Sequence, residues 1–136
     1  MKRKASAVWH GTGKDGNGHL STKSTVLNET PYNYSSRFEE GIGTNPEELI
    51  AAAHAGCFTM KLSFVLTGAG FEPGKLETQC AIHLESGRIT KSELSVVAEV
   101  EGIDESKFGA LVEEAKNECP VSKLLNADIN VTYSLK

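Results

Sequence analysis

The sequence predicts an α+β fold with an N-terminal β meander, a long central helix, further strands and a second helix. Alternating side chains around glycine turns mark the first part of the chain, which is typical of short strands. After Pro46 the apolar residues recur at helical spacing, and after Leu76 β-branched residues return in strand-like stretches. The order β, α, β, α, β along a short chain favours an α+β protein.

The β meander is predicted to occupy roughly the first forty residues. Strands are expected at Ala5–Trp9 and Ser24–Leu27, separated by glycine turns between Gly11 and Gly18. Aromatic residues then flank Arg37, and residues 39 to 43 predict a flexible loop. This segment supplies the first strands of the fold.

A long helix is predicted to begin at Thr44–Glu48 and to run to about Leu66. Its start combines a capping side chain, a proline in the first turn and carboxylates that the helix dipole stabilises. Because His54, Lys61 and the acidic start interrupt the apolar run, we expect a core helix rather than a membrane span. Its apolar face is expected to contain Leu49, Ile50, Ala53, Cys57, Met60 and Phe64.

Three further strands are expected in the second half of the chain. In Leu76–Leu84 and Ile89–Val100, apolar and polar residues partly alternate and β-branched residues are frequent. A Ser86-Gly87 turn joins the two stretches. Ile129–Leu135 has the same character and predicts the closing strand. Together they predict a second sheet.

Two helices are expected between these strands. Asp104 or Ser106 caps a helix that ends near Glu118. Pro120 stands at the first turn of a short helix through Leu125. The second half therefore alternates between strands and helices.

The composition predicts a single domain over residues 1–136. The 136 residues are 39% hydrophobic and 24% charged, which is typical of a soluble globular protein. The net charge of −4 comes from dispersed acidic and basic residues, which argues against nucleic-acid binding. The basic start is followed by a polar, glycine-rich stretch rather than an apolar run. We therefore expect no secretory signal, no membrane contact and a cytoplasmic location.

The three cysteines carry the candidate chemistry. They form no C-x-x-C motif or metal-ligand pair, so we expect neither a disulfide framework nor a metal. Cys57 lies inside the long helix, where it is either a small buried hydrophobe or a nucleophile. Cys119 precedes Pro120 at a helix N-cap, where it is either a thiolate favoured by backbone N–H groups or an ordinary helix-end cysteine. Cys80 lies in a strand without basic neighbours, and we expect it to be structural.

Three other residues have both a functional and an ordinary interpretation. His54 stands three residues before Cys57, so it is a partner base, half of a zinc site or a packed histidine. Arg37 is a functional cation or a solvated surface residue. Glu47 either serves a site or complements the helix dipole. Residue patterns alone therefore allow thiol chemistry without selecting it.

Three segments resemble one protein family. They are Pro31–Glu39, Gly43–Phe58 and Glu118–Ser122. Together they resemble the OsmC/Ohr family, and most closely its osmotically inducible OsmC branch. The similarity extends over nearly the whole chain, and Gly56 replaces the alanine that is common before the reactive cysteine.

The resemblance implies an OsmC-like fold, an intertwined homodimer with active sites at the subunit interface, and reduction of organic hydroperoxides. It places Cys57 at the peroxidatic position and Cys119 at the resolving position. Arg37 falls on the active-site arginine, and Glu47 on the carboxylate that holds it. No cofactor is implied, and an external dithiol or thiol-protein reductant must restore the thiols.

Other functions compete with this one. The first alternative is a non-catalytic, stress-related domain that binds a small molecule or a protein. The second is another cysteine-dependent enzyme, an acyl- or thiol-transferase that uses Cys57 with His54. Lack of peroxide-dependent thiol loss would favour the first alternative, and a covalent acyl-enzyme without disulfide formation would mark the second.

Overall fold

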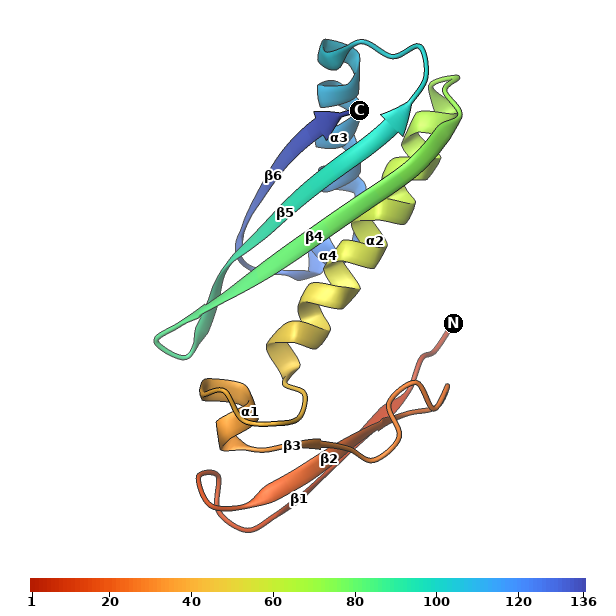
Figure 1. Ribbon diagram of the computed structural model, residues 1–136. Coiled ribbons are helices and arrows are strands. Elements are labelled where there is room, and N and C mark those ends of the chain that lie inside the picture. Colours follow the sequence, from red (N-terminus) through yellow and green to blue (C-terminus); the bar gives the residue numbers. More distant parts are fainter. The chain divides into compact units, whose positions relative to one another are not determined.

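The computed structural model describes residues Met1–Lys136 and has an α+β architecture, as the sequence predicts. The chain divides into two compact units, Met1–Leu49 and Ile50–Lys136 (Figure 1). Each unit contains one three-stranded sheet. The expectation of a single domain over residues 1–136 stays a prediction.

The first unit contains the β meander. Its strands β1 (Ala5–His10), β2 (Asn17–Thr22) and β3 (Thr30–Tyr32) pair antiparallel in that order. The short helix α1 (Tyr34–Phe38) follows directly. The predicted strand at Ala5–Trp9 is therefore confirmed and extends by one residue.

The predicted strand at Ser24–Leu27 is wrong, because this segment is a loop between β2 and β3. Its backbone bonds locally: the Thr22 N–H donates to the Leu27 carbonyl at 2.9 Å, and the Thr25 N–H donates to the Thr22 carbonyl at 2.9 Å. Thr25 has a positive φ of 64°. The Ser24 and Thr22 hydroxyls also accept from the N–H groups of Val26 and Leu27. Such side-chain bonds to nearby backbone compete with strand pairing, and they override the β-branched composition here.

Helix α1 is not among the predicted elements, although its signal is present in the sequence. The Asn33 side chain accepts from the Ser36 N–H at 2.8 Å, and the Ser36 hydroxyl accepts from the Asn33 N–H at 2.9 Å. This reciprocal pair is a capping box, which starts a helix. It turns part of the aromatic segment around Arg37 into a helix.

The long helix α2 spans Pro46–Gly68, close to its predicted limits. The Asn45 side chain caps it by accepting from the Glu48 N–H at 2.8 Å. In addition, the Thr44 hydroxyl donates to the Glu48 carboxylate at 2.7 Å. Proline and capping side chains at this point therefore determine where the helix begins.

The second unit contains the larger sheet, in the order β4-β5-β6. Strands β4 (Pro73–Glu85) and β5 (Arg88–Val100) are antiparallel, and β6 (Asp128–Leu135) runs parallel to β5. Ser86 and Gly87 both have positive φ, of 51° and 75°, which suits a tight hairpin turn. The three predicted strands are confirmed.

The remaining helices are α3 (Glu105–Glu118) and α4 (Pro120–Leu124). Asp104, not Ser106, caps α3 by accepting from the Lys107 N–H at 2.7 Å. Figure 1 shows α2, α3 and α4 on one side of the second sheet. Side chains of α2, α3 and β5, together with Cys119, form the core, which contains Phe58, Leu62, Leu66, Leu94, Val96, Ala98, Phe108, Val112, Ala115 and Cys119.

Helix α2 buries a different face from the predicted one. The buried stripe is His54, Phe58, Leu62 and Leu66. Met60 and Phe64, which were expected on the core face, are 65% and 67% exposed.

By length and composition α2 could cross a membrane, and 22% of its most apolar stretch is buried inside the protein. Because α2 is apolar on more than one side, its sequence does not specify which side packs.

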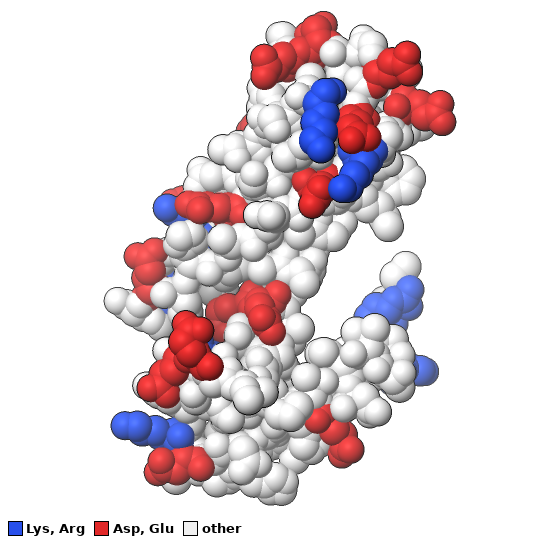
Figure 2. Space-filling view, in the orientation of Figure 1, with Lys and Arg blue, Asp and Glu red and all other residues white.

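Charged side chains of both signs lie on the face drawn in Figure 2, with uncharged surface between them. Some charged side chains of the protein are paired, such as Lys75 with Glu77 at 3.0 Å and Lys116 with Glu113 at 2.8 Å. Exposed pairs of this kind contribute little to stability, typically below about 1 kcal/mol. The packed core, rather than surface charge, therefore stabilises the second unit.

Candidate functional site

The structure brings Cys57 and Cys119 together. Cys57 is half-buried on α2, and Cys119 is fully buried where α3 ends and α4 begins. Both thiols are free, and the two side chains are within hydrogen-bonding contact. The two cysteines that the sequence singled out are thus neighbours, although 61 residues lie between them along the chain.

The surroundings of Cys57 raise the pKa of its thiol. Burial is the largest cause, and the hydrogen bond with Cys119 adds to it. The backbone N–H of Val121 and, more weakly, the charge of Lys61 act in the opposite direction. Since the attacking form of a cysteine is the thiolate, efficient reaction at neutral pH requires further positive charge near this sulfur.

The contact with Val121 was not predicted. The sequence predicts that the free N–H groups at the start of α4 stabilise the Cys119 thiolate. In the structure the Cys119 side chain makes no capping hydrogen bond. The Val121 N–H instead lies against the sulfur of Cys57. The proline at the start of α4 was the available signal, because it marks a helix end with unpaired N–H groups.

Arg37 and Glu47 form an ion pair in the first unit. Arg37 Nη2 lies 2.8 Å from Glu47 Oε1, and Arg37 Nε donates to Oε1 at 2.9 Å and to Oε2 at 3.3 Å. Two guanidinium nitrogens therefore contact one carboxylate, an arrangement that fixes the guanidinium plane. The Glu47 side chain is only 13% exposed, whereas that of Arg37 is 39% exposed. The predicted pairing is present, with the cation at the surface.

Aromatic side chains surround this arginine. Its guanidinium carbon lies 5.0 Å from the centre of the Phe38 ring, within cation–π range. A cavity of about 240 Å³ lies beside it, within the first unit. Its lining consists of Trp9, Gly13, Tyr32, Asn33, Tyr34, Arg37 and Phe38. Arg37 is therefore held by a carboxylate on one side and by aromatic rings on another.

His54 is fully buried and does not pair with Cys57. Its Nδ1 lies 2.6 Å from Ser92 Oγ, and its Nε2 lies 2.9 Å from Ser122 Oγ. Burial lowers the pKa of the imidazole, which favours its neutral form. Both ring nitrogens are occupied by hydroxyls, so neither is free to act as a base on Cys57 or to bind zinc. Of the three interpretations, the packed histidine is the one that the structure contains.

Cys80 has the surroundings expected of a structural cysteine. Its sulfur lies 3.3 Å from Ser92 Oγ, and burial raises the pKa of its thiol. The hydrogen-bonding partner of this thiol is therefore a serine rather than another cysteine. Its structural role stays a prediction.

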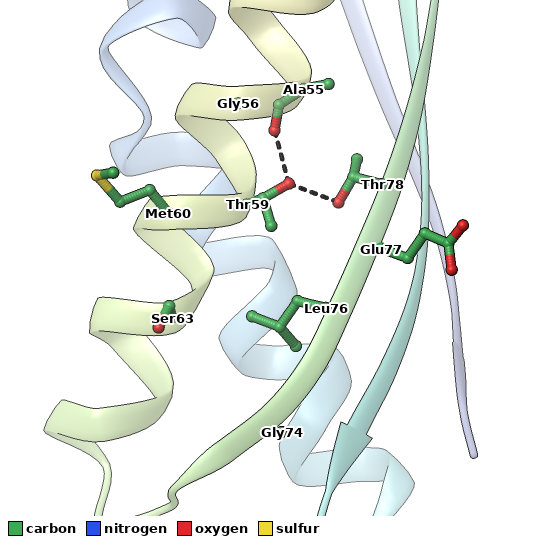
Figure 3. A pocket seen from close by; sticks show the side chains of 9 residues that line it. All are labelled: Ala55, Gly56, Thr59, Met60, Ser63, Gly74, Leu76, Glu77 and Thr78. Carbon is green, nitrogen blue, oxygen red and sulfur yellow. Dashed lines mark hydrogen bonds between the residues drawn. The ribbon is translucent and has the colours of Figure 1, made fainter.

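An open groove lies between α2 and β4 on the exposed side of the helix (Figure 3). The Thr59 hydroxyl on α2 forms a hydrogen bond with Thr78 Oγ1 on β4 at 2.7 Å, and its Oγ1 lies 2.6 Å from the Ala55 carbonyl oxygen. Met60 and Gly56 line the helix side. Phe58, the residue after Cys57, points away from this groove and is buried in the core.

The chain is similar to proteins of one family in sequence and in structure. The family described as OsmC-like protein matches residues 39–134. Peroxiredoxin OsmC of Escherichia coli (strain K12) is 46% identical over 140 residues, covering 100% of this chain and 98% of that protein. Organic hydroperoxide resistance protein OhrB of Bacillus subtilis (strain 168) is 31% identical over 121 residues, covering 88% of this chain and 89% of OhrB.

Solved structures give the same result for the fold. The crystal structure of OhrB of Bacillus subtilis superposes with a TM-score of 0.65 over 98% of both chains, at 26% identity. An OsmC like protein from Mycoplasma pneumoniae superposes with a TM-score of 0.76, over 99% of this chain and 97% of that chain. At 13% identity the second likeness concerns the fold alone.

The burial of His54 predicts a pH-dependent stability. Its folded pKa lies below the unfolded value of 6.5, so the unfolded chain binds the proton more readily. The contribution of neutral His54 is complete above about pH 6.5 and is lost as the pH falls below it. Urea unfolding at pH 8 and pH 5 should therefore show a larger loss of stability in the parent than in His54→Gln. An equal loss in both proteins would contradict this.

Proposed function

The chain belongs to the OsmC/Ohr family, and from this membership we propose that it is a cysteine-based peroxidase that reduces organic hydroperoxides to alcohols. Relatives at 46% and 31% identity carry the names peroxiredoxin and organic hydroperoxide resistance protein. The observation that supports the proposal best is the contact between the free thiols of Cys57 and Cys119. Two thiols in contact are what a disulfide-forming peroxidase requires.

The proposed reaction uses the two thiols in sequence. The Cys57 thiolate attacks one oxygen of the hydroperoxide, an S–O bond forms, and the O–O bond breaks. The leaving alkoxide takes up a proton and becomes the alcohol, and Cys57 is left as a sulfenic acid. The Cys119 thiol then attacks that sulfur, a disulfide forms, and water leaves. Both electrons come from the thiols, and an external dithiol or thiol-protein reductant restores them.

The position of Cys119 suits its resolving role. A sulfenic acid that persists reacts with a second hydroperoxide and becomes sulfinic acid, which is generally irreversible. Because Cys119 is buried against Cys57, it is already in place when the sulfenic acid forms. The contact therefore protects Cys57 as well as completing the reaction.

Arg37 is proposed to activate the thiolate. The surroundings of Cys57 within its own unit raise the pKa of the thiol, so an additional cation is needed for reaction at neutral pH. A guanidinium would lower that pKa and would stabilise the negative charge on the departing alkoxide. The ion pair with Glu47 supports this role, because it holds the guanidinium in one orientation.

We also propose that the protein is a homodimer. The exposed side of α2 carries Met60 and Phe64, large apolar side chains that a lone chain leaves in water. His54 and Lys61 interrupt the apolar sequence of this helix, which favours a protein partner over a lipid bilayer. A second copy presents the same apolar side, so two copies of α2 cover each other in a symmetric interface.

A cytoplasmic location is consistent with this chemistry. All three cysteines are free thiols. Thiols persist in a reducing compartment, where a thiol reductant for the disulfide is also present. We therefore propose that the enzyme works in the cytoplasm.

The first prediction concerns the disulfide. One equivalent of an organic hydroperoxide should remove two thiols per chain and link Cys57 to Cys119, leaving Cys80 free. Thiol titration and peptide mapping by mass spectrometry measure both results. A link between Cys57 and Cys80 would overturn the assignment of the resolving cysteine. The absence of any peroxide-dependent thiol loss would favour a non-catalytic binding domain.

Arg37→Ala should keep the fold, because the side chain is at the surface, although the largely buried Glu47 carboxylate loses its cation and some stability is lost. It should slow the oxidation of Cys57. Losing charge stabilisation of ~2–4 kcal/mol at the breaking bond lowers the rate by roughly thirtyfold to a thousandfold. Arg37→Lys should recover only part of the rate, since an ammonium cannot reproduce the paired contact with Glu47. Stopped-flow measurement of thiol loss tests this. If Arg37→Ala reacts within about twofold of the parent while Cys57→Ser is inactive, another residue activates the thiolate.

Phe64→Glu should shift the protein toward monomer, because it introduces a charge into the proposed α2 interface. Disruption of a central interface aromatic typically costs about 2 kcal/mol or more, so the dissociation constant should rise at least thirtyfold. Sedimentation equilibrium measures the change. The matched control is Gln79→Glu, which adds the same charge to an exposed position on β4. A parent that is monomeric at micromolar concentration and fully active would defeat the proposed dimer.

A further inference from the structure

The short helix α4 and the cysteine before it place three groups against α2. Cys119 precedes it and contacts Cys57, the Val121 N–H lies against the same sulfur, and the Ser122 hydroxyl bonds to His54. Only the last of these is a hydrogen bond from an α4 side chain to the rest of the chain. With five residues, α4 is too short to be stable by itself, so its position depends on such contacts.

His54 is anchored on its other side by the sheet. Its Nδ1 lies 2.6 Å from Ser92 Oγ on β5, and Ser92 Oγ lies 3.3 Å from the sulfur of Cys80 on β4. His54 and Ser92 are both fully buried, so water does not compete for these bonds. The chain of contacts therefore runs from the sheet, through the imidazole of α2, to the hydroxyl of α4.

The neutral imidazole suits this position chemically. It offers one N–H donor and one acceptor nitrogen, and a serine hydroxyl can serve as either partner. Both ring nitrogens are therefore satisfied in either tautomer without a buried charge. A protonated ring would be two donors and would carry a charge that nothing at this place neutralises.

We propose that His54 is a positioning residue for the resolving step: through Ser122 it holds α4 so that Cys119 stays in contact with Cys57. The inference rests on the proposed peroxidase function. When Cys57 becomes a sulfenic acid, it gains an oxygen that must fit beside Cys119. The anchor keeps α4 against α2 during this change, so disulfide formation with loss of water competes successfully with attack by a second hydroperoxide.

The test measures how the Cys57 sulfenic acid is partitioned between disulfide and sulfinic acid. Full-length Ser122→Ala and His54→Leu are titrated with an organic hydroperoxide, and the products are quantified by mass spectrometry. We expect the ratio of disulfide to sulfinic acid to fall about fivefold in each, which corresponds to losing one hydrogen bond. His54→Gln, whose amide can reach Ser122, should recover part of the ratio. Because it is a ratio, it is independent of how fast the sulfenic acid forms.

The matched control is Thr59→Val, which removes a hydrogen bond between α2 and β4 at half-buried Thr59 without touching α4. Its ratio should equal that of the parent. An unchanged ratio in Ser122→Ala, or an equal fall in Thr59→Val, would overturn the role of His54. Ser122→Ala keeps the test valid even if His54→Leu fails to fold. If the parent forms neither disulfide nor sulfinic acid, the proposed peroxidase function itself fails.

Discussion

The packing of one stripe of α2 against the larger sheet is the constraint on which the thiol site depends. His54, Phe58, Leu62 and Leu66 recur every four residues and are all buried. With this stripe turned inward, Cys57 lies at the edge of the buried surface, where α4 meets the helix. A rotation of α2 that buried Met60 and Phe64 instead would move Cys57 away from Cys119. The apolar burial that stabilises α2 therefore also sets the position of the Cys57 thiol.

The packing that brings Cys57 next to Cys119 also makes the Cys57 thiol harder to deprotonate. Burial beside Cys119 raises the pKa of Cys57, and the nearby Val121 N–H and Lys61 offset this only in part. A thiol that is kept protonated is stable against adventitious oxidation, but it reacts slowly with peroxide. The proposed activation of Cys57 by Arg37 would supply the cation that these surroundings lack. The Arg37–Glu47 pair has the geometry of such a cation, since two nitrogens of one guanidinium contact a single, largely buried carboxylate.

His54 shows how a residue can serve a site without touching the reacting atoms. It stands one turn of helix before Cys57, which made it a natural candidate for a partner base. In a helix, however, residues three apart share a side only approximately, and here the imidazole is directed into the core while the thiol remains at its edge. The two serines that occupy its ring nitrogens lie on β5 and α4, far from His54 in sequence. No local pattern could have identified them.

The sequence alone determined the elements that depend on local physics. Asn45 and Pro46 specify where α2 begins, Ser86 and Gly87 specify the hairpin, and Asp104 caps α3, because caps and turns involve neighbouring residues. The three segments that resemble the family likewise marked Cys57 and Cys119 without any coordinates. Local physics did not identify the loop at 24–27, where hydroxyls bond the backbone in place of a partner strand. Only the tertiary structure decided which side of α2 is buried, which group the Val121 N–H contacts and how His54 is satisfied, because each depends on segments that meet only after folding.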